Sequence, residues 1–108
     1  MTIRTVDGLD AILDEAHWET HIVSRHPELK GWLTQVTETL QQPIGVYRSK
    51  RDRTTRIYAK LYERVALPDA APERLALLVY VRESNGFVVT AYLAGAMMRS
   101  LGEQIWPS

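Results

Sequence analysis

The chain has 108 residues, 45% of them apolar, and its 13 basic residues balance its 13 acidic ones. These values predict one compact domain over residues 1–108 and exclude a chain that is disordered through low hydrophobicity and high net charge. The absence of cysteine excludes disulfide bonds, thiolate metal sites and a cysteine nucleophile. With no signal-peptide pattern and no apolar stretch long enough to span a membrane, we expect a cytoplasmic protein.

The N-terminal half carries a helical pattern after a short stretch, residues 2–6, that suits an edge strand. A first helix is predicted to begin at residue 14 or 15 and to end at His26, because Pro27 disfavours the helical conformation in the residue before it. A second, amphipathic helix is predicted to end at Pro43, from apolar residues at helical spacing: Leu29, Leu33, Val36 and Leu40.

From Pro43 onward the pattern becomes typical of β-strands. Four strands are predicted from β-branched and aromatic residues, over 44–48, 57–65, 75–82 and 87–93, with a hairpin turn at residues 83–86. Residues 94–101 are predicted to form a short helix before Ile105 and Trp106, which fold back as an apolar plug. The predicted fold class is α+β, with two N-terminal helices packed on one face of a four-stranded antiparallel sheet.

Alternation along the strands predicts which side chains share a face of the sheet. We expect an aliphatic face beneath the helices. The other face should gather groups on which single-stranded nucleic acid can stack or pair, namely Tyr58, Tyr62, Tyr80, Tyr92, Lys60, Arg64, Arg82 and Thr90. The alternative is that tyrosines simply favour strands, where Tyr–Lys and Tyr–Arg pairs stabilise a sheet with no ligand.

Charge is distributed unevenly along the chain. Residues 1–43 carry three basic and seven acidic groups, whereas residues 44–64 carry seven basic groups and two acidic ones. This asymmetry favours a polyanionic partner, and a solvated basic turn is the alternative. The basic groups of the second segment are Arg48, Lys50, Arg51, Arg53, Arg56, Lys60 and Arg64.

All three histidines lie within ten residues. His17 and His21 share a helical face one turn after Asp14, but no H-E-x-x-H motif or fourth ligand accompanies them, so we expect no metal or other cofactor. Imidazole can accept and return a proton near neutral pH. RNA cleavage without a metal needs a base, an acid and cations around the phosphate. These roles suit His21 or His26 with Arg25, Arg48 and Lys60; capping or surface roles are the alternative for each histidine.

Four segments together resemble the phage-associated members of the barnase, EndoU, colicin and RelE-like (BECR) ribonuclease superfamily. The resemblance covers roughly residues 3–106. The four segments are His17-Trp18-x-x-His21-Ile22-x-x-Arg25-His26-Pro27-Glu28-Leu29, Pro43-Ile44-x-Val46-Tyr47-Arg48-Ser49, Leu77-Leu78-Val79-Tyr80-Val81 and Val89-Thr90-Ala91-Tyr92. The first of them is the most specific.

The resemblance implies a metal-independent endoribonuclease domain of BECR-like fold, acting as a toxin or as a phage or mobile-element RNA-processing module. The motif residues it carries over are His21, Arg25, His26, Arg48, Ser49, Thr90 and Tyr92, and all of them except Ser49 are predicted to be catalytic. The expected partner is single-stranded RNA, with a cognate inhibitor protein as a second candidate; the RNA-binding residues would be Tyr58, Tyr62, Tyr80, Lys60, Arg51, Arg53 and Arg56. The alternative is a non-catalytic RNA-binding or protein-interaction domain with an apolar patch formed by Trp32, Met97, Met98 and Trp106.

Overall fold

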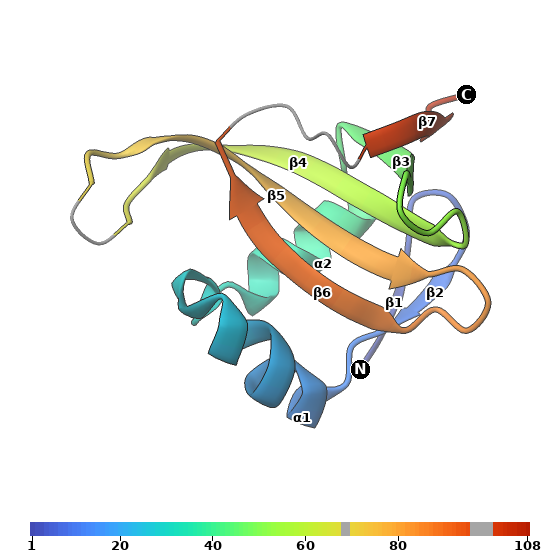
Figure 1. Ribbon diagram of the computed structural model, residues 1–108, viewed down its shortest axis with the longest axis horizontal. Helices are drawn as coiled ribbons and strands as arrows, with labels where there is room; N and C mark the ends of the chain where they lie inside the picture. The colour runs from blue at the N-terminus through green and yellow to red at the C-terminus, as the bar shows by residue number, and fades with distance from the viewer. Residues whose placement is uncertain (68–69, 96–100) are drawn as a thin grey trace.

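A computed structural model describes residues 1–67, 70–95 and 101–108 of the chain (Figure 1). Its elements, in chain order, are β1 (Thr2–Arg4), β2 (Asp10–Ile12), α1 (Glu15–His17), the π-helix η1 (Trp18–Val23), the 3₁₀ helix η2 (Pro27–Leu29), α2 (Leu33–Gln41), β3 (Gly45–Ser49), β4 (Thr55–Val65), β5 (Glu73–Arg82), β6 (Val88–Ala94) and β7 (Leu101–Trp106). None of the helices in the described ranges has the length and apolar composition needed to cross a lipid bilayer.

The predicted α+β fold with a four-stranded sheet is wrong. In the described residues the fold is mostly β, with a main antiparallel sheet of five strands in the order β6-β5-β4-β3-β7 and a separate β1–β2 hairpin. The fifth strand, β7, pairs with β3 with two irregularities in register. Its sequence begins Leu-Gly-Glu-Gln, which lacks the β-branched residues that mark strands, so the sequence predicts no strand here and places Leu101 at the end of a short helix and Ile105 and Trp106 in an apolar plug.

The two predicted helices are present only in part. The first is one α-helical turn continued by the π-helix η1, and the helical residues end at Arg25, which confirms the predicted stop before Pro27. Gly31, with φ +82°, separates η2 from α2, so the second predicted helix begins only at Leu33. Of the helix predicted over 94–101, residues 96–100 lie outside the described ranges; Ala94 ends β6 and Leu101 begins β7.

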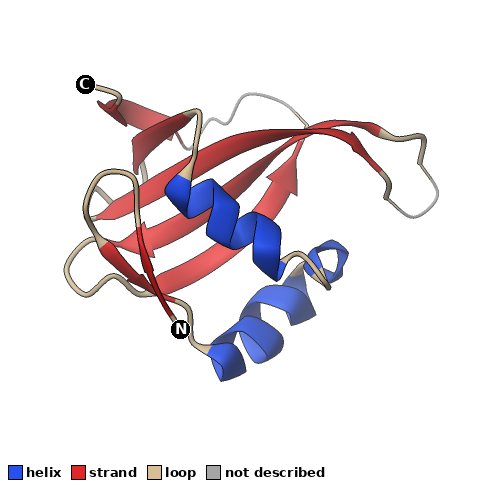
Figure 2. Ribbon diagram, turned by 180° about the vertical axis from the view of Figure 1, so that it is seen from behind, coloured by secondary structure: helices blue, strands red, loops and turns tan. Residues whose placement is uncertain are grey.

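The helices and the β1–β2 hairpin cover one face of the main sheet, as Figure 2 shows. Helix α2 packs on β4, β5 and β1, and η1 packs on β6. The main core therefore lies between this layer and the sheet. Its fully buried aliphatic members include Ile22, Leu29, Val36, Leu40, Val46, Leu77, Val79, Val81 and Val88.

The prediction that one face of the sheet gathers the tyrosines is wrong. Tyr58 pairs in register with Val79 and lies under the helices, fully buried, and Tyr62 packs against the same core. Tyr80 and Tyr92 lie on the opposite face, over a small second cluster formed by Ile57, Ala59 and Leu78. The sequence is ambiguous on β4, because Ile57, Tyr58 and Ala59 are buried one after another, on both faces of the sheet, so alternation does not define which face of this strand meets the helices.

The predicted hairpin turn at residues 83–86 is confirmed, and it joins β5 to β6. Gly86 has φ +75°, and its carbonyl accepts a hydrogen bond from Ile12 N at 2.7 Å. A Cβ atom at Gly86 would lie 2.0 Å from the carbonyl oxygen of Asp10, because β2 runs directly against this turn. Glycine is therefore required both by the backbone conformation and by the close approach of β2.

We expect Gly86→Ala to lower the free energy of unfolding by about 3 kcal/mol or more, since it adds a steric clash to an unfavourable positive φ. Gly8→Ala is the matched control. Gly8 also has a positive φ, +91°, but open space surrounds its Cβ position. The control should cost only about 1 to 2 kcal/mol. Urea denaturation of both variants measures the difference, and equal losses would contradict the packing of β2 on this turn.

Candidate functional site

A pocket of about 440 Å³ lies between the N-terminal helices and the edge strand β6. The helical side contributes all three histidines and one arginine, and β6 contributes the opposite wall. The lining residues are His17, His21, Arg25, His26, Val89, Thr90 and Tyr92. Five of the six residues that the sequence predicts to be catalytic therefore meet here: His21, Arg25, His26, Thr90 and Tyr92.

The histidines converge because the segment is not a regular α-helix. His26 is nine positions after His17, roughly two and a half turns of an α-helix, which would place the two side chains on opposite sides. In this chain the π-helix η1 widens the turns, and His26 leaves the helix with φ −131° and ψ 72° ahead of Pro27. Both side chains can then line one pocket. π-Helical turns inside α-helices occur frequently at functional sites.

His17 connects the helical segment to the sheet. Its Nε2 lies 2.8 Å from the carbonyl oxygen of Val89, and since a carbonyl can only accept, Nε2–H is the donor. Its ring stacks on the ring of His21, with centroids 4.7 Å apart and planes 25° apart. From the sequence, His17 is a family-motif residue and a candidate metal ligand, with capping or surface roles as the alternative. The four-residue spacing from His21 was the signal that the two rings are neighbours.

Asp14 has a role other than ligating a metal. Its Oδ2 accepts a hydrogen bond of 2.8 Å from the backbone N–H of His17 and so caps α1. Over the described ranges, no group of three or more His, Asp or Glu side chains is arranged to hold a metal ion. What the pocket offers is therefore imidazole, guanidinium and hydroxyl chemistry.

His26 and Tyr92 lie next to each other in the pocket. Their ring centroids lie 5.5 Å apart, and His26 Nδ1 is 3.6 Å from Glu28 Oε1. The hydroxyl of Tyr92 is 2.7 Å from that of Tyr80, which holds the Tyr92 ring in place. Arg25 is exposed, and its side chain makes no hydrogen bond or ion pair to the residues that the structure describes, so its guanidinium is available to an anion.

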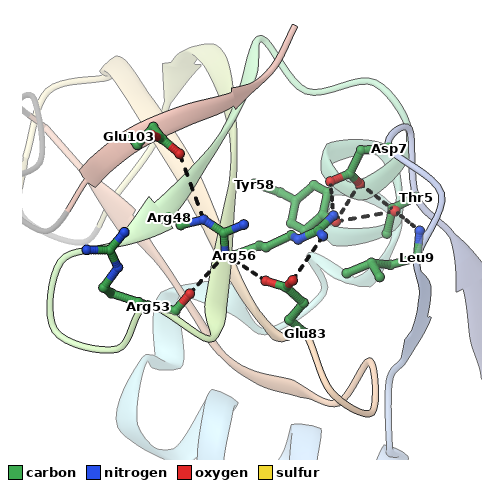
Figure 3. A network of polar contacts seen from close by, with 9 residues as sticks. All are labelled: Thr5, Asp7, Leu9, Arg48, Arg53, Arg56, Tyr58, Glu83 and Glu103. Carbon is green, nitrogen blue, oxygen red and sulfur yellow. Dashed lines mark hydrogen bonds and ion pairs between the residues drawn. The ribbon is translucent and has the colours of Figure 1, made fainter. Parts of the chain in front are cut away.

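Arg48, the sixth predicted catalytic residue, lies outside this pocket. It belongs to a polar network on β3, β4 and the adjoining turns, shown in Figure 3. Its Nη1 donates to Glu83 Oε2 at 2.8 Å and to the carbonyl of Arg53 at 2.9 Å, and its Nε is 3.9 Å from Glu103. The structure thus surrounds this guanidinium with carboxylates, whereas it leaves Arg25 exposed.

Arg56 is the centre of the same network. It donates to Asp7 at 2.7 Å and lies 3.3 Å from Glu83, and its side chain is 18% exposed. Hydrogen bonds from Arg56 and then Arg48 lower the pKa of Glu83 below its usual value. Burial alone would raise the pKa of Asp7, but hydrogen bonds from Tyr58, Thr5 and Arg56 outweigh it and lower that pKa.

Two of the predicted RNA-binding tyrosines are engaged beneath the helices. The hydroxyl of Tyr58 donates to Asp7 Oδ1 at 2.6 Å, and burial together with this bond raises the pKa of Tyr58 strongly. The hydroxyl of Tyr62 donates to Glu38 Oε1 at 2.7 Å, and burial raises the pKa of Tyr62 to about 12. Lys60 donates to the carbonyl of Gln42 at 2.9 Å. None of these three side chains reaches the histidine pocket.

The loop between β3 and β4 presents the remaining predicted cations. Lys50, Arg51 and Arg53 are exposed, and the hydroxyl of Ser49 accepts hydrogen bonds from the backbone at residues 51 and 52. The carboxylate of Asp52 accepts hydrogen bonds from the hydroxyls of Thr54 and Thr55.

Of the predicted apolar patch, Trp32 and Trp106 pack against the main core, and Met97 and Met98 lie outside the described ranges.

We expect Asp7→Asn to lower the free energy of unfolding at pH 7 by about 2 kcal/mol, because it removes charge-assisted hydrogen bonds. The folded-state pKa of Asp7 lies below the ordinary 3.8, so its contribution is complete above that pH and disappears as pH falls through the folded pKa. Urea denaturation at several pH values should therefore show the gap between wild type and variant closing below about pH 4.

The control for this experiment is Asp10→Asn. Asp10 pairs with Arg4 at 3.0 Å, but its side chain is 62% exposed. Exposed pairs contribute little, so this variant should stay within about 0.5 kcal/mol of wild type. A gap for Asp7→Asn that did not change with pH would contradict the lowered pKa of Asp7.

No protein-family model, no curated protein and no solved structure matches the chain, so its function has to be inferred from its residues and their geometry.

Proposed function

We propose that the protein is a metal-independent endoribonuclease that cleaves single-stranded RNA in the histidine pocket. The observation that supports this most directly is the meeting of His21, His26 and Arg25 with the hydroxyls of Thr90 and Tyr92 around one pocket. Acid–base catalysis requires two proton-transfer groups and a cation close to one phosphate. The resemblance of residues 17–29 to the BECR ribonucleases favours the same activity.

In the proposed reaction, one of His21 and His26 takes the proton from the ribose 2′-hydroxyl as its oxygen attacks phosphorus. The bond from phosphorus to the 5′-oxygen breaks, and the other histidine gives that oxygen a proton. The products are a 2′,3′-cyclic phosphate and a free 5′-hydroxyl. Arg25 stabilises the negative charge that develops on the phosphoryl oxygens, to which Thr90 and Tyr92 donate hydrogen bonds.

His17 acts in this proposal as a positioning residue. Its Nε2–H is engaged with the carbonyl of Val89, and its ring stacks on that of His21. Fixing one ring nitrogen to a backbone carbonyl sets both the tautomer and the orientation of an imidazole. His17 thereby restricts the rotamers of His21 and holds it towards the pocket.

We expect His21→Ala and His26→Ala each to reduce cleavage of a labelled single-stranded RNA by roughly 10² to 10⁴, since each removes a proton-transfer group. Wild-type cleavage should be unchanged by EDTA, and mass spectrometry should find 2′,3′-cyclic phosphate ends. Arg25→Ala should reduce cleavage roughly 10²- to 10³-fold.

The matched control is Lys30→Ala. Lys30 is another exposed cation of the N-terminal helical region, but it does not line the pocket. It should cleave at the wild-type rate. Cleavage that needs an added metal ion, or full activity in both histidine variants, would refute this site. A folded protein that binds RNA in a salt-dependent manner but never cleaves it would instead be a binding module.

A further inference from the structure

The face of the main sheet opposite the helices carries a row of partly exposed aromatic rings, and it is the face turned to the viewer in Figure 1. Tyr47 and Tyr80 lie in one cross-strand row on either side of Ile57, which pairs in register with both. Adjacent strands are about 4.8 Å apart, so the backbones at Tyr47 and Tyr80 are about 10 Å apart. All three residues belong to the small second cluster.

This row begins at the histidine pocket. The ring of Tyr80 stacks on that of Tyr92, with centroids 5.7 Å apart and planes 27° apart. Tyr92 in turn lines the pocket and faces the ring of His26 at 5.5 Å. The rings of His26, Tyr92, Tyr80 and Tyr47 thus form a series from the pocket across β6 and β5 to β3, with Ile57 of β4 between the last two rings.

Cations without a carboxylate partner lie close to the Tyr47 end of this row. The β3–β4 loop starts directly after Ser49, two residues past Tyr47, and exposes Lys50, Arg51 and Arg53. Across the described residues, none of these three side chains forms an ion pair with a carboxylate, in contrast to Arg48 and Arg56. In Figure 3 the guanidinium of Arg53 points away from the network.

We propose that an unpaired RNA strand runs from the histidine pocket across Tyr92 and Tyr80 to Tyr47, with bases against these rings, and that its further phosphates bind the β3–β4 loop. The proposal rests on the proposed function for the position of the cleaved phosphate. Bases stack on aromatic side chains with little sequence preference, and they can do so only when they are unpaired. This surface therefore selects single-stranded over double-stranded RNA.

Binding is measured by fluorescence anisotropy with a labelled 2′-O-methyl RNA 12-mer of mixed sequence, which lacks the 2′-hydroxyl and cannot be cleaved. The same strand annealed to its complement is the duplex probe. The wild-type protein should bind the single strand at least about tenfold more tightly. Tyr80→Leu and Tyr47→Leu should each weaken binding roughly 5- to 100-fold, the usual effect of removing one stacking ring.

Tyr80→Phe and Tyr47→Phe are the matched controls, because they keep the ring, and each should stay within about threefold of wild type. A melting temperature of each leucine variant close to that of the wild type shows that its loss of binding comes from the missing ring and not from a disturbed fold. A duplex bound as tightly as the single strand, or leucine variants with wild-type affinity, would overturn the strand path.

The loop is tested separately through the salt dependence of binding. Each phosphate neutralised on a single strand contributes about 0.7 to the slope of log affinity against log salt. Replacing Lys50, Arg51 and Arg53 together by alanine should therefore reduce that slope by about 2. The control replaces Arg4 and Lys30, exposed cations outside the loop, and should leave the slope unchanged. An unchanged slope in the triple variant would remove the loop from the path.

These measurements separate the strand path from the nuclease activity. If cleavage depends on His21 but the tyrosine and loop substitutions do not change binding, the nuclease activity is supported and the strand path is refuted. Single-strand binding that depends on the tyrosines, in a protein that cleaves no RNA, would support the path and refute the nuclease.

Discussion

The paired charges around Arg56 join parts of the chain that are far apart in sequence. Arg56 on β4 binds Asp7, which lies between β1 and β2, and Glu83, which follows β5; Glu83 also binds Arg48 on β3. The network thereby fixes the hairpin β1–β2 against one end of the main sheet. Strand β2 then runs beside the β5–β6 turn. This contact holds the helical segment after Leu13 next to the start of β6, and the histidine pocket lies between the two.

Much of the pocket can be predicted from the sequence because it depends on local features. The clustering of three histidines and Arg25 ahead of Pro27 is visible in eleven residues, and the family resemblance adds Thr90 and Tyr92. The stop before Pro27 and the hairpin at residues 83–86 follow from backbone preferences of single residues. The convergence of His17 with His26 is harder to predict, because a π-helix has no comparable signature in a sequence.

The features that the sequence analysis misassigned depend on distant contacts. The full burial of Tyr58 depends on Asp7, 51 residues earlier, whose carboxylate accepts a hydrogen bond from the Tyr58 hydroxyl, and alternation along β4 carries no information about that partner. Likewise, Arg48 is indistinguishable from a phosphate ligand until Glu83 and Glu103 are placed beside it. Strand β7 is stabilised by pairing with β3 despite weak strand propensity of its own.

The hydrogen bond from His17 to the carbonyl of Val89 also covers part of the exposed edge of the main sheet. Strand β6 is an edge of the main sheet, and unpaired edge groups are templates for strands of other molecules. In this chain, Ile12 forms a β-bridge with Phe87, and its backbone N–H donates a hydrogen bond to the carbonyl of Gly86. The side chain of His17 donates to the carbonyl of Val89. The side chain that positions the proposed base thus also protects the sheet from edge-to-edge aggregation.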